Sequence, residues 1–341
     1  MANDAATPTS CWLEAVVLVA WEGSICMLVR IVACGTFALA LAAPAAAAEQ
    51  LIRVLTSGTG SAYYPLGVAL ADNIAKTMPG VKTSVQATKA SFENLNLLQA
   101  GSGDIAFALG DSLSDAWKGN EEAGFKTPLR KLRGIAAIYP NYIQIVARAD
   151  AGVATLADLK AKRISVGALR SGVERNARVI FAAAAIAYRD FARVEYMPFG
   201  QSVELMKDRQ LDVTLQSAGL GALAVRDVAT AIAVVVVPIP PEVVKKTNDP
   251  AYLPAAIPAN TYRGQTAAVP TAAVQNYLVT HEGVSNETAY AMTRALWTGL
   301  DPLVAAHPAA KAIDIKHALD GMPVPLHPGA ARYYKEIGLI K

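Results

Sequence analysis

The pattern of apolar and polar positions becomes regular at residues 51–76. Residues 51–55 form a short apolar run typical of a buried strand. Residues 66–76 repeat apolar positions at helical spacing, with Leu66, Leu70 and Ile74 on one face. A loop of mainly small and polar residues, 56–65, lies between them. The pattern therefore predicts a strand, a loop and a helix whose N-terminal N–H groups face whatever lies above the loop.

Apolar runs and helical spacing alternate along the rest of the chain, which favours an α/β fold with mainly parallel sheets. We expect strands at 81–88, 105–109, 135–148, 164–167, 194–198, 213–215, 234–239 and 271–280. We expect helices at 92–100, 155–160, 171–187, 202–208, 221–228, 286–307 and 309–318. The strand at 135–148 is predicted to be interrupted at Tyr139-Pro140-Asn141.

One segment of helix, turn, aspartate and strand occurs twice, once around Asp104 and once around Asp212, at the same spacing. The repeat indicates two similar α/β lobes. We assign residues 49–140 and 269–341 to the first lobe and residues 141–268 to the second. Two long strands would cross between the lobes and leave a cleft that can close on a ligand.

The first 48 residues do not have the pattern of a folded domain. Residues 27–48 combine a basic start, a short apolar run and an Ala-x-Ala end, so we expect a signal peptide cleaved near Ala48 and a periplasmic protein. We interpret residues 1–26 as a misassigned extension. All three cysteines lie before residue 49. Without Arg30 and three acidic residues, 30 basic and 25 acidic residues remain, a net charge of +5 with no basic block, so nucleic-acid binding is not indicated.

Small polar loops follow most of the predicted strands, where open α/β sheets bind ligands. They lie at 57–61, 88–91, 110–112, 167–172, 199–201 and 216–219. In the first loop Thr59 or Ser61 can cap the next helix, and Ser91 and Ser171 can cap two later helices. Free N–H groups at a helix N-terminus form an anion site. The first loop is neither a Rossmann fingerprint nor a P-loop, and an ordinary βα turn is the alternative.

Five segments resemble, in order, the receptors of the TAXI family, the extracytoplasmic binding proteins of TRAP transporters. They lie at 58–67 (Gly-Thr-Gly-Ser-Ala-Tyr-Tyr-Pro-Leu-Gly), 85–95, 166–178, 256–262 and 319–330. The resemblance covers the chain from about residue 50. It implies a type II periplasmic binding protein fold, with two α/β lobes joined by crossing strands. It also implies a cleft ligand such as glutamate, 2-oxoglutarate or another small carboxylate, delivered to a fused integral-membrane TRAP permease driven by an ion gradient.

The resemblance carries the role of ligand contact to Gly58, Thr59, Ser61, Tyr63, Ser91, Ser171, Gly172 and Ser217. The predicted cleft loops add Gly60, Thr88, Asp111, Arg170, Val173 and Gln216. The chain departs from the family at Lys89 and Arg170, where glycine is usual, and at Val173, where threonine is usual. Arg170 either grips a ligand carboxylate in bidentate fashion or faces the solvent, as loop arginines commonly do.

Neither an enzyme nor a metal or cofactor site is expected. His281, His307, His317 and His327 lie outside the predicted cleft loops and lack metal-binding spacing. His307 and His327 fit helix ends or turns. No histidine is placed to complete a catalytic set with Asp111 and Ser112. We expect a monomeric TRAP receptor for a small carboxylate or amino acid. A receptor of an ABC importer, and an enzyme or sensor on the same fold, are the alternatives.

Overall fold

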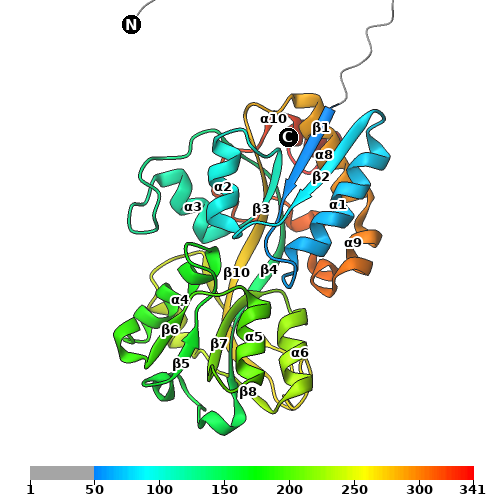
Figure 1. Cartoon of the computed structure of the whole chain (residues 1–341). Helices are drawn as coiled ribbons and strands as arrows, with labels where there is room; N and C mark the ends of the chain where they lie inside the picture. The colour runs from blue at the N-terminus through cyan, green and yellow to red at the C-terminus, as the bar shows by residue number, and fades with distance from the viewer. Residues whose placement is uncertain (1–49) are drawn as a thin grey trace, which may run out of the picture. The chain divides into compact units, whose positions relative to one another are not determined.

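Ten strands form one continuous sheet in the computed structural model, which describes residues 50–341 (Figure 1). The order is β2-β1-β3-β10-β4-β7-β5-β6, with β8 paired to β4 and β9 to β10. The strands are β1 (Gln50–Leu55), β2 (Val81–Gln86), β3 (Ile105–Leu109), β4 (Leu132–Arg148), β5 (Arg163–Ser165), β6 (Arg193–Glu195), β7 (Val213–Ala218), β8 (Val234–Val237), β9 (Tyr252–Ile257) and β10 (Val269–His281).

The two ends of the sheet repeat one arrangement. At one end β1 lies between β2 and β3, and at the other β5 lies between β6 and β7, with parallel pairing throughout. The long strands β10 and β4 pair antiparallel with each other and with β3 and β7, so they connect the two ends. We call the part built on β1, β2 and β3 the first lobe and the part built on β5, β6, β7 and β8 the second lobe. The predicted α/β class, with two lobes joined by crossing strands, is confirmed.

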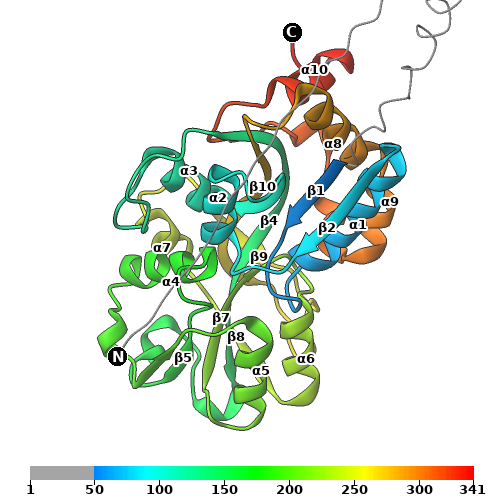
Figure 2. The same ribbon diagram turned by 45° about the horizontal axis from the view of Figure 1, so that its top comes forward.

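Helices cover both faces of the sheet (Figures 1 and 2). The first lobe holds α1 (Tyr63–Thr77), α2 (Ser91–Gln99), α3 (Gly110–Lys118), α8 (Asn286–Thr298), α9 (Leu300–Ala306) and α10 (Pro328–Glu336). The second holds α4 (Gly172–Ala183), α5 (Phe199–Lys207), α6 (Leu223–Ala231) and α7 (Pro241–Lys245). Leu66, Leu70 and Ile74 of α1 are fully buried, as their helical spacing predicts.

The two repeated aspartates make the same contacts in both lobes. Asp104 accepts hydrogen bonds from the backbone N–H (2.7 Å) and the Nε (2.9 Å) of Arg53. Asp212 accepts the equivalent bonds from Arg163, each at 2.9 Å. The backbone N–H of each aspartate donates to the carbonyl of the same arginine at 3.0 Å. The repeat is therefore structural, and it ties β3 to β1 and β7 to β5 in the same way.

Several boundaries differ from the predictions. Strand β4 runs unbroken through Tyr139-Pro140-Asn141, because a register shift opposite Gln275 and Tyr277 of β10 absorbs the irregularity. Residues 110–112 begin α3 instead of forming a loop. Residues 309–318 contain two short 3₁₀ helices. The predicted signal peptide and N-terminal extension lie outside the described residues.

Candidate functional site

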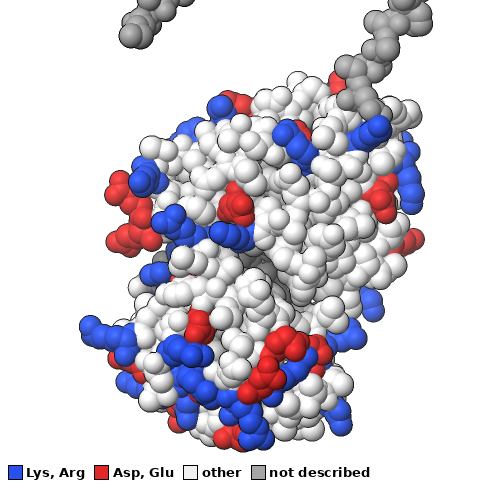
Figure 3. All heavy atoms as spheres, viewed as in Figure 1, with Lys and Arg blue, Asp and Glu red and all other residues white. Residues whose placement is uncertain are grey.

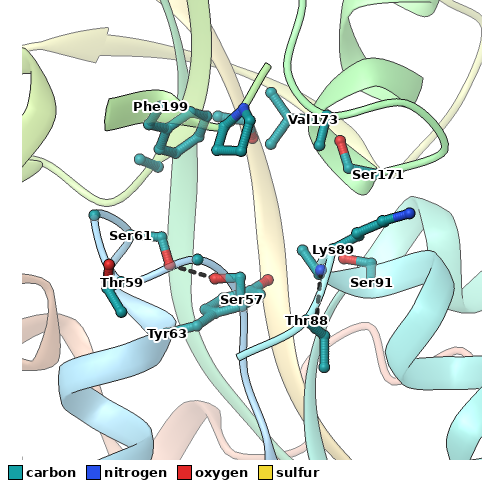
Figure 4. A pocket seen from close by; sticks show the side chains of 18 of the residues that line it. Ser57, Thr59, Ser61, Tyr63, Thr88, Lys89, Ser91, Ser171, Val173 and Phe199 are labelled. Carbon is teal, nitrogen blue, oxygen red and sulfur yellow. Dashed lines mark hydrogen bonds between the residues drawn. The ribbon is translucent and has the colours of Figure 1, made fainter. Parts of the chain in front are cut away.

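A cavity of about 470 Å³ lies between the two lobes. Its walls come from the loops that follow β1 and β2 in the first lobe and β5 and β6 in the second, together with the ends of β3 and β7. Figure 3 shows the surface hollowed where the lobes meet. In Figure 4 the first-lobe residues face Ser171, Val173 and Phe199 of the second lobe. Each wall thus stands at the carboxyl end of a strand, the expected position for a ligand.

Most of the predicted ligand-binding residues come together at this cavity. Those that line it are Gly58, Thr59, Gly60, Ser61, Tyr63, Thr88, Ser91, Ser171, Val173 and Ser217. Those that do not are Asp111, Arg170, Gly172 and Gln216. Contact of any of these residues with a ligand stays a prediction.

Four helices begin at the cavity wall. The lining includes Tyr63 and Ser91, the first residues of α1 and α2, and Phe199, the first residue of α5. It also includes Ser171, the N-cap of α4. The first backbone N–H groups of a helix have no acceptor within the helix, and its N-terminus carries a partial positive charge. The cavity is therefore bordered by donors and positive dipole ends from both lobes.

Formal charge is sparse around the cavity. Among the described residues that line it, none is acidic and Lys89 alone is basic. Lys89 is exposed, and in Figure 4 its ammonium end lies at the outer edge of the labelled residues. The electrostatic character of the cavity thus comes mainly from backbone dipoles, which favour an anion.

The helix caps differ in part from the predictions. Ser171 caps α4, because its Oγ accepts from the N–H of Glu174 at 3.2 Å. The N-cap of α1 is Ala62, with no side-chain cap, so neither Thr59 nor Ser61 caps that helix. Ser91 begins α2, and its Oγ accepts from the N–H of Leu109 at 3.0 Å. The Ser91 hydroxyl therefore ties α2 to the end of β3.

Side-chain hydrogen bonds hold the loops of the first lobe. Ser61 is hydrogen-bonded to Ser57 across its own loop (Figure 4). The Oγ1 of Thr88 accepts from the N–H of Ala90 at 3.0 Å and lies 2.9 Å from the carbonyl oxygen of Thr56. These bonds accompany an unusual backbone at Ala90, with φ of 69° and ψ of −148°. This region is almost restricted to glycine, so Ala90 stores backbone strain at the cavity.

Glycines 58 and 60 both line the cavity. Neither has a positive φ, so no left-handed turn requires them. A Cβ added at Gly60 would lie 3.7 Å from the backbone nitrogen of Gly200 in the second lobe. That is an ordinary van der Waals distance, so the approach of the two loops does not require glycine at position 60 either.

Tyr63 contributes its ring to the cavity but uses its hydroxyl elsewhere. The ring is buried and stacks on Phe107, with centroids 5.0 Å apart. The hydroxyl donates to Oδ1 of Asn276 on β10. Burial raises the pKa of Tyr63 well above its usual value, so it stays a neutral donor.

The crossing strands form a polar floor beneath the cavity. Asn276 donates to the carbonyl of Tyr139 and to Oδ1 of Asn141, each at 2.8 Å. Asn141 in turn donates to the carbonyl of Ser217 at 2.8 Å. Hydrogen bonds therefore run from α1 through β10 and β4 to β7, and so from one lobe to the other. Tyr139, Asn141 and Ser217 all line the cavity.

Asp111 and Gln216 lie in the interior instead of at the cavity. Asp111 accepts from the hydroxyl of Tyr252 (2.6 Å) and the amide of Asn176 (2.7 Å), both in the second half of the chain. Burial raises the pKa of the Asp111 carboxyl. Asp111 therefore bridges α3 to the second lobe. Gln216 is fully buried on β7, and neither of its amide atoms has a partner among the described residues.

Arg170 and Gly172 occupy the rim where the lobes touch. Arg170 is exposed, has a φ of 59° and lines a separate groove of about 180 Å³ with Arg175 and Arg178. A Cβ added at Gly172 would lie 2.7 Å from the Oγ of Ser91. Gly172 thus permits contact between α4 and the first lobe.

A model of the NMT1-like family matches residues 54–338. The chain belongs to the NMT1-like family. In this NMT1-like protein the matched region begins in β1 and ends after α10, so it contains both lobes and every loop of the cavity.

Two solved structures share the fold of this NMT1-like protein. MatC from Rhodopseudomonas palustris, with bound malate, is 12% identical, with 84% of this chain and 96% of that chain covered and a TM-score of 0.54. PhnD1 from Prochlorococcus marinus, in complex with methylphosphonate, is 9% identical, with coverage of 86% and 100% and a TM-score of 0.54. At such identities the likeness shows the fold alone, that of periplasmic binding proteins, which confirms the predicted type II periplasmic binding fold.

The site residues predicted from the sequence include neither of the two β4 residues on the cavity floor of this NMT1-like protein. Tyr139 and Asn141 lie on the floor, at the point where the apolar pattern of β4 is broken. That break was the available signal, and it was interpreted as an interruption of the strand. Phe199 lies in a loop that was predicted to face the cleft but was not selected as a site residue.

Two buried histidines of this NMT1-like protein cap short helical segments. His307 and His327 are N-caps, accepting from the N–H groups of Ala309 and Gly329 at 3.1 Å, which confirms their expected places. No cluster of three or more His, Cys, Asp or Glu side chains in residues 50–341 could hold a metal ion. Within the same residues, no helix combines the length and apolar character that crossing a membrane requires.

Proposed function

We propose that this NMT1-like protein is a periplasmic solute-binding receptor of the TAXI family, which captures a small carboxylate and delivers it to a TRAP-type transporter. The observation that carries the proposal is the meeting of four helix N-termini, two from each lobe, at one cavity without acidic side chains. The ligand would lie between the lobes and bring them together. The receptor is expected to act as a monomer in the periplasm, without cofactor or turnover.

A carboxylate suits this arrangement physically. Each helix N-terminus favours an anion by about 0.3–1 kcal/mol, and each hydrogen bond to a charged group contributes about 1.5–3 kcal/mol. A few such contacts reach micromolar affinity without an arginine in the cavity, since a micromolar dissociation constant corresponds to about 8 kcal/mol. The malate and methylphosphonate of the two related structures are also small anions.

The type of transporter is the part that rests on resemblance. TAXI receptors deliver to fused TRAP permeases, whereas receptors of ABC importers use the same fold. A gene for a fused symporter-like permease beside the gene of this protein supports the TRAP receptor. A gene for an ATPase in that place supports the ABC alternative and refutes the TRAP assignment.

A thermal-shift screen tests the carboxylate proposal. Purified protein lacking residues 1–48 is heated with small carboxylates and with their uncharged amides as matched controls. A ligand at about 100 times its dissociation constant stabilises the folded state by about 2.7 kcal/mol. For a chain of this size that corresponds to a rise of roughly 4–5 °C in the melting temperature. Stabilisation by amides as large as that by acids would refute anion recognition.

A further inference from the structure

The four helix N-termini at the cavity lie in two pairs, one at each end. At one end the loop before α1 meets α5, since a Cβ added at Gly60 would lie 3.7 Å from a backbone nitrogen in the first turn of α5. At the other end α4 meets α2, since a Cβ added at Gly172 would lie 2.7 Å from the Oγ of Ser91. Figure 4 shows Phe199 of the first pair on the left and Ser171 of the second pair on the right. The cavity therefore has an α1–α5 end and an α2–α4 end.

The two ends differ in charge and in free donors. Helices α2 and α4 carry Glu93 and Glu174 in their first turns, whereas α1 and α5 carry no acidic residue there. A carboxylate in the first turn offsets the positive end of the helix dipole. Glu174 also pairs with Arg178, so the difference in charge rests mainly on Glu93. Glu93 moreover accepts from the backbone N–H of Lys89 at 2.6 Å, and Ser171 accepts from that of Glu174 at 3.2 Å. A ligand carboxylate is therefore favoured at the α1–α5 end.

Apolar side chains cover much of the opposite end. Leu109 of β3, Val173 of α4 and Ala90 beside α2 all line the cavity there. A second ligand carboxylate against this wall would be buried without a charged partner, which is costly. A hydrocarbon group in the same place is stabilised, because its surface and that of the wall leave water together.

Lys89 is the one charged side chain among the described lining residues, and it turns outward. It is exposed, and in Figure 4 its ammonium end points away from the other labelled side chains. The carboxylate of Glu93 lies beside its backbone. Ion pairs of exposed side chains contribute little, so Lys89 is a weak partner for a second ligand carboxylate.

We propose that the ligand is a monocarboxylate with an apolar body, and not a dicarboxylate such as glutamate or 2-oxoglutarate. The inference rests on the proposed carboxylate function. The carboxylate lies at the α1–α5 end, where the first turns of two helices from different lobes carry no acidic residue. The apolar body lies against Leu109 and Val173 at the α2–α4 end.

The test compares acids of equal size that differ in one end group. In each pair, an isopropyl group in the second acid replaces a carboxylate of the first. The pairs are succinate with 4-methylpentanoate, malate with 2-hydroxy-4-methylpentanoate, aspartate with leucine, and glutamate with 2-amino-5-methylhexanoate. Calorimetric titration should show, in the pair that binds most tightly, the apolar acid at least about tenfold tighter than the dicarboxylate.

A substitution in the wall tests where the apolar body lies. Val173→Thr replaces a methyl group by a hydroxyl of nearly the same size, which the apolar acid would bury without a partner. It should weaken the apolar acid at least about threefold and leave the dicarboxylate unchanged or tighter. Val68→Thr is the matched control, because Val68 is an exposed residue of α1 that does not line the cavity. Thermal unfolding of each ligand-free variant checks that it is folded.

Two changes of charge test the assignment of the ends. Gln201 lies in the first turn of α5, and Gln201→Glu should weaken every acid that binds by about two- to fivefold. Glu93→Gln keeps an acceptor for the N–H of Lys89 but removes the charge at the α2–α4 end. It should tighten the dicarboxylates by about two- to fivefold and so narrow the preference for the apolar acid. A tenfold loss of dicarboxylate affinity in Lys89→Gln would make Lys89 the partner of a second carboxylate and overturn the inference.

The outcomes separate this inference from the proposed function. A dicarboxylate that binds as tightly as its apolar counterpart overturns the inference and leaves a carboxylate receptor standing. If the tightest acid of the thermal-shift screen lies outside these pairs, it is titrated against its own counterpart with or without the second carboxylate, and the same criterion applies. If the amides of the apolar acids bind as tightly as the acids, or if no acid binds, the proposed function fails and the inference with it.

Discussion

Gly172 provides the sharpest test of contact between the lobes. It is the first residue of α4 in the second lobe, and it faces the first lobe across a very short distance. A Cβ at this position would lie 2.7 Å from the Cδ1 of Leu109 and 2.7 Å from the Oγ of Ser91. Ser91 cannot turn away freely, because its Oγ accepts a hydrogen bond from the N–H of Leu109 at 3.0 Å. Gly172→Ala should therefore hold the lobes apart.

The free-energy cost of the Gly172→Ala substitution follows from these distances. Non-bonded carbon atoms rest about 3.5–4.0 Å apart, so the two surfaces must separate by about 1 Å. Overpacking of this kind costs about 1–3 kcal/mol. Both neighbours of the added methyl group lie in the first lobe, so separation of the lobes relieves the overlap. The penalty then falls on the closed, ligand-bound arrangement and weakens binding by about 5- to 150-fold.

Calorimetric titration with the tightest acid of the screen measures the loss. Gly200→Ala is the matched control, since Gly200 also lies in the first turn of a helix at the cavity and an added Cβ there has no heavy atom within 4 Å. Small-angle scattering should show a smaller radius of gyration on ligand binding for the wild type and a smaller change for Gly172→Ala. Unchanged affinity and unchanged scattering of Gly172→Ala would refute the argument that the two lobes meet at this residue when ligand is bound.

Three further substitutions test other features of the site. Ala90→Gly should raise the free energy of unfolding by about 1 kcal/mol in chemical denaturation, because glycine relieves strain of about 1–3 kcal/mol at an entropic cost of up to about 1 kcal/mol. Arg170→Gly should raise the free energy of unfolding by a similar amount. The φ of Arg170 is 59°, in the left-handed region that glycine adopts more easily than arginine. The Arg170→Gly substitution should leave ligand affinity within about twofold. Arg170 does not line the cavity, so its removal takes no hydrogen bond away from a ligand there. Burial raises the pKa of Asp111 in the folded protein, so its stabilising effect is present below the unfolded pKa of about 4 and is lost as pH rises through the folded pKa. Asp111→Asn, measured by unfolding at several pH values, should remove that loss.

Each of these expectations has a contrary result. A destabilised Ala90→Gly protein would mean that the strain at Ala90 is absent. A tenfold loss of dicarboxylate affinity in Arg170→Gly would return Arg170 to the ligand, as the bidentate interpretation requires. An unchanged pH dependence in Asp111→Asn would show that this carboxyl does not titrate between the folded and unfolded states.

Local patterns predicted the units of the fold. The spacing of Leu66, Leu70 and Ile74 predicted the buried face of α1, because that spacing depends only on helix geometry. The repeated aspartates predicted two equivalent lobes, and Asp104 and Asp212 make the same bonds in each. The small polar loops pointed to the cavity, because loops at the carboxyl ends of parallel strands meet at one edge of the sheet.

Local patterns failed where a side chain finds its partner across the fold. Ser91 resembles a helix cap in the sequence, but its hydroxyl is taken by Leu109, which lies eighteen residues later and adjacent only after β3 joins the sheet. Asp111 resembles a cleft residue, but its carboxyl is held by Tyr252, 141 positions away. These bonds depend on strand order and on the contact between the lobes, and neither is encoded in local spacing.

The sequence by itself therefore determined the α/β class, the duplicated lobes and the loops that carry most of the cavity wall. These properties follow from periodicity, glycine and proline placement and short-range repetition. Only the tertiary structure decided which residues form the floor. Tyr139, Asn141 and Ser217 meet there because β4 and β7 lie side by side, and that pairing joins residues more than seventy positions apart.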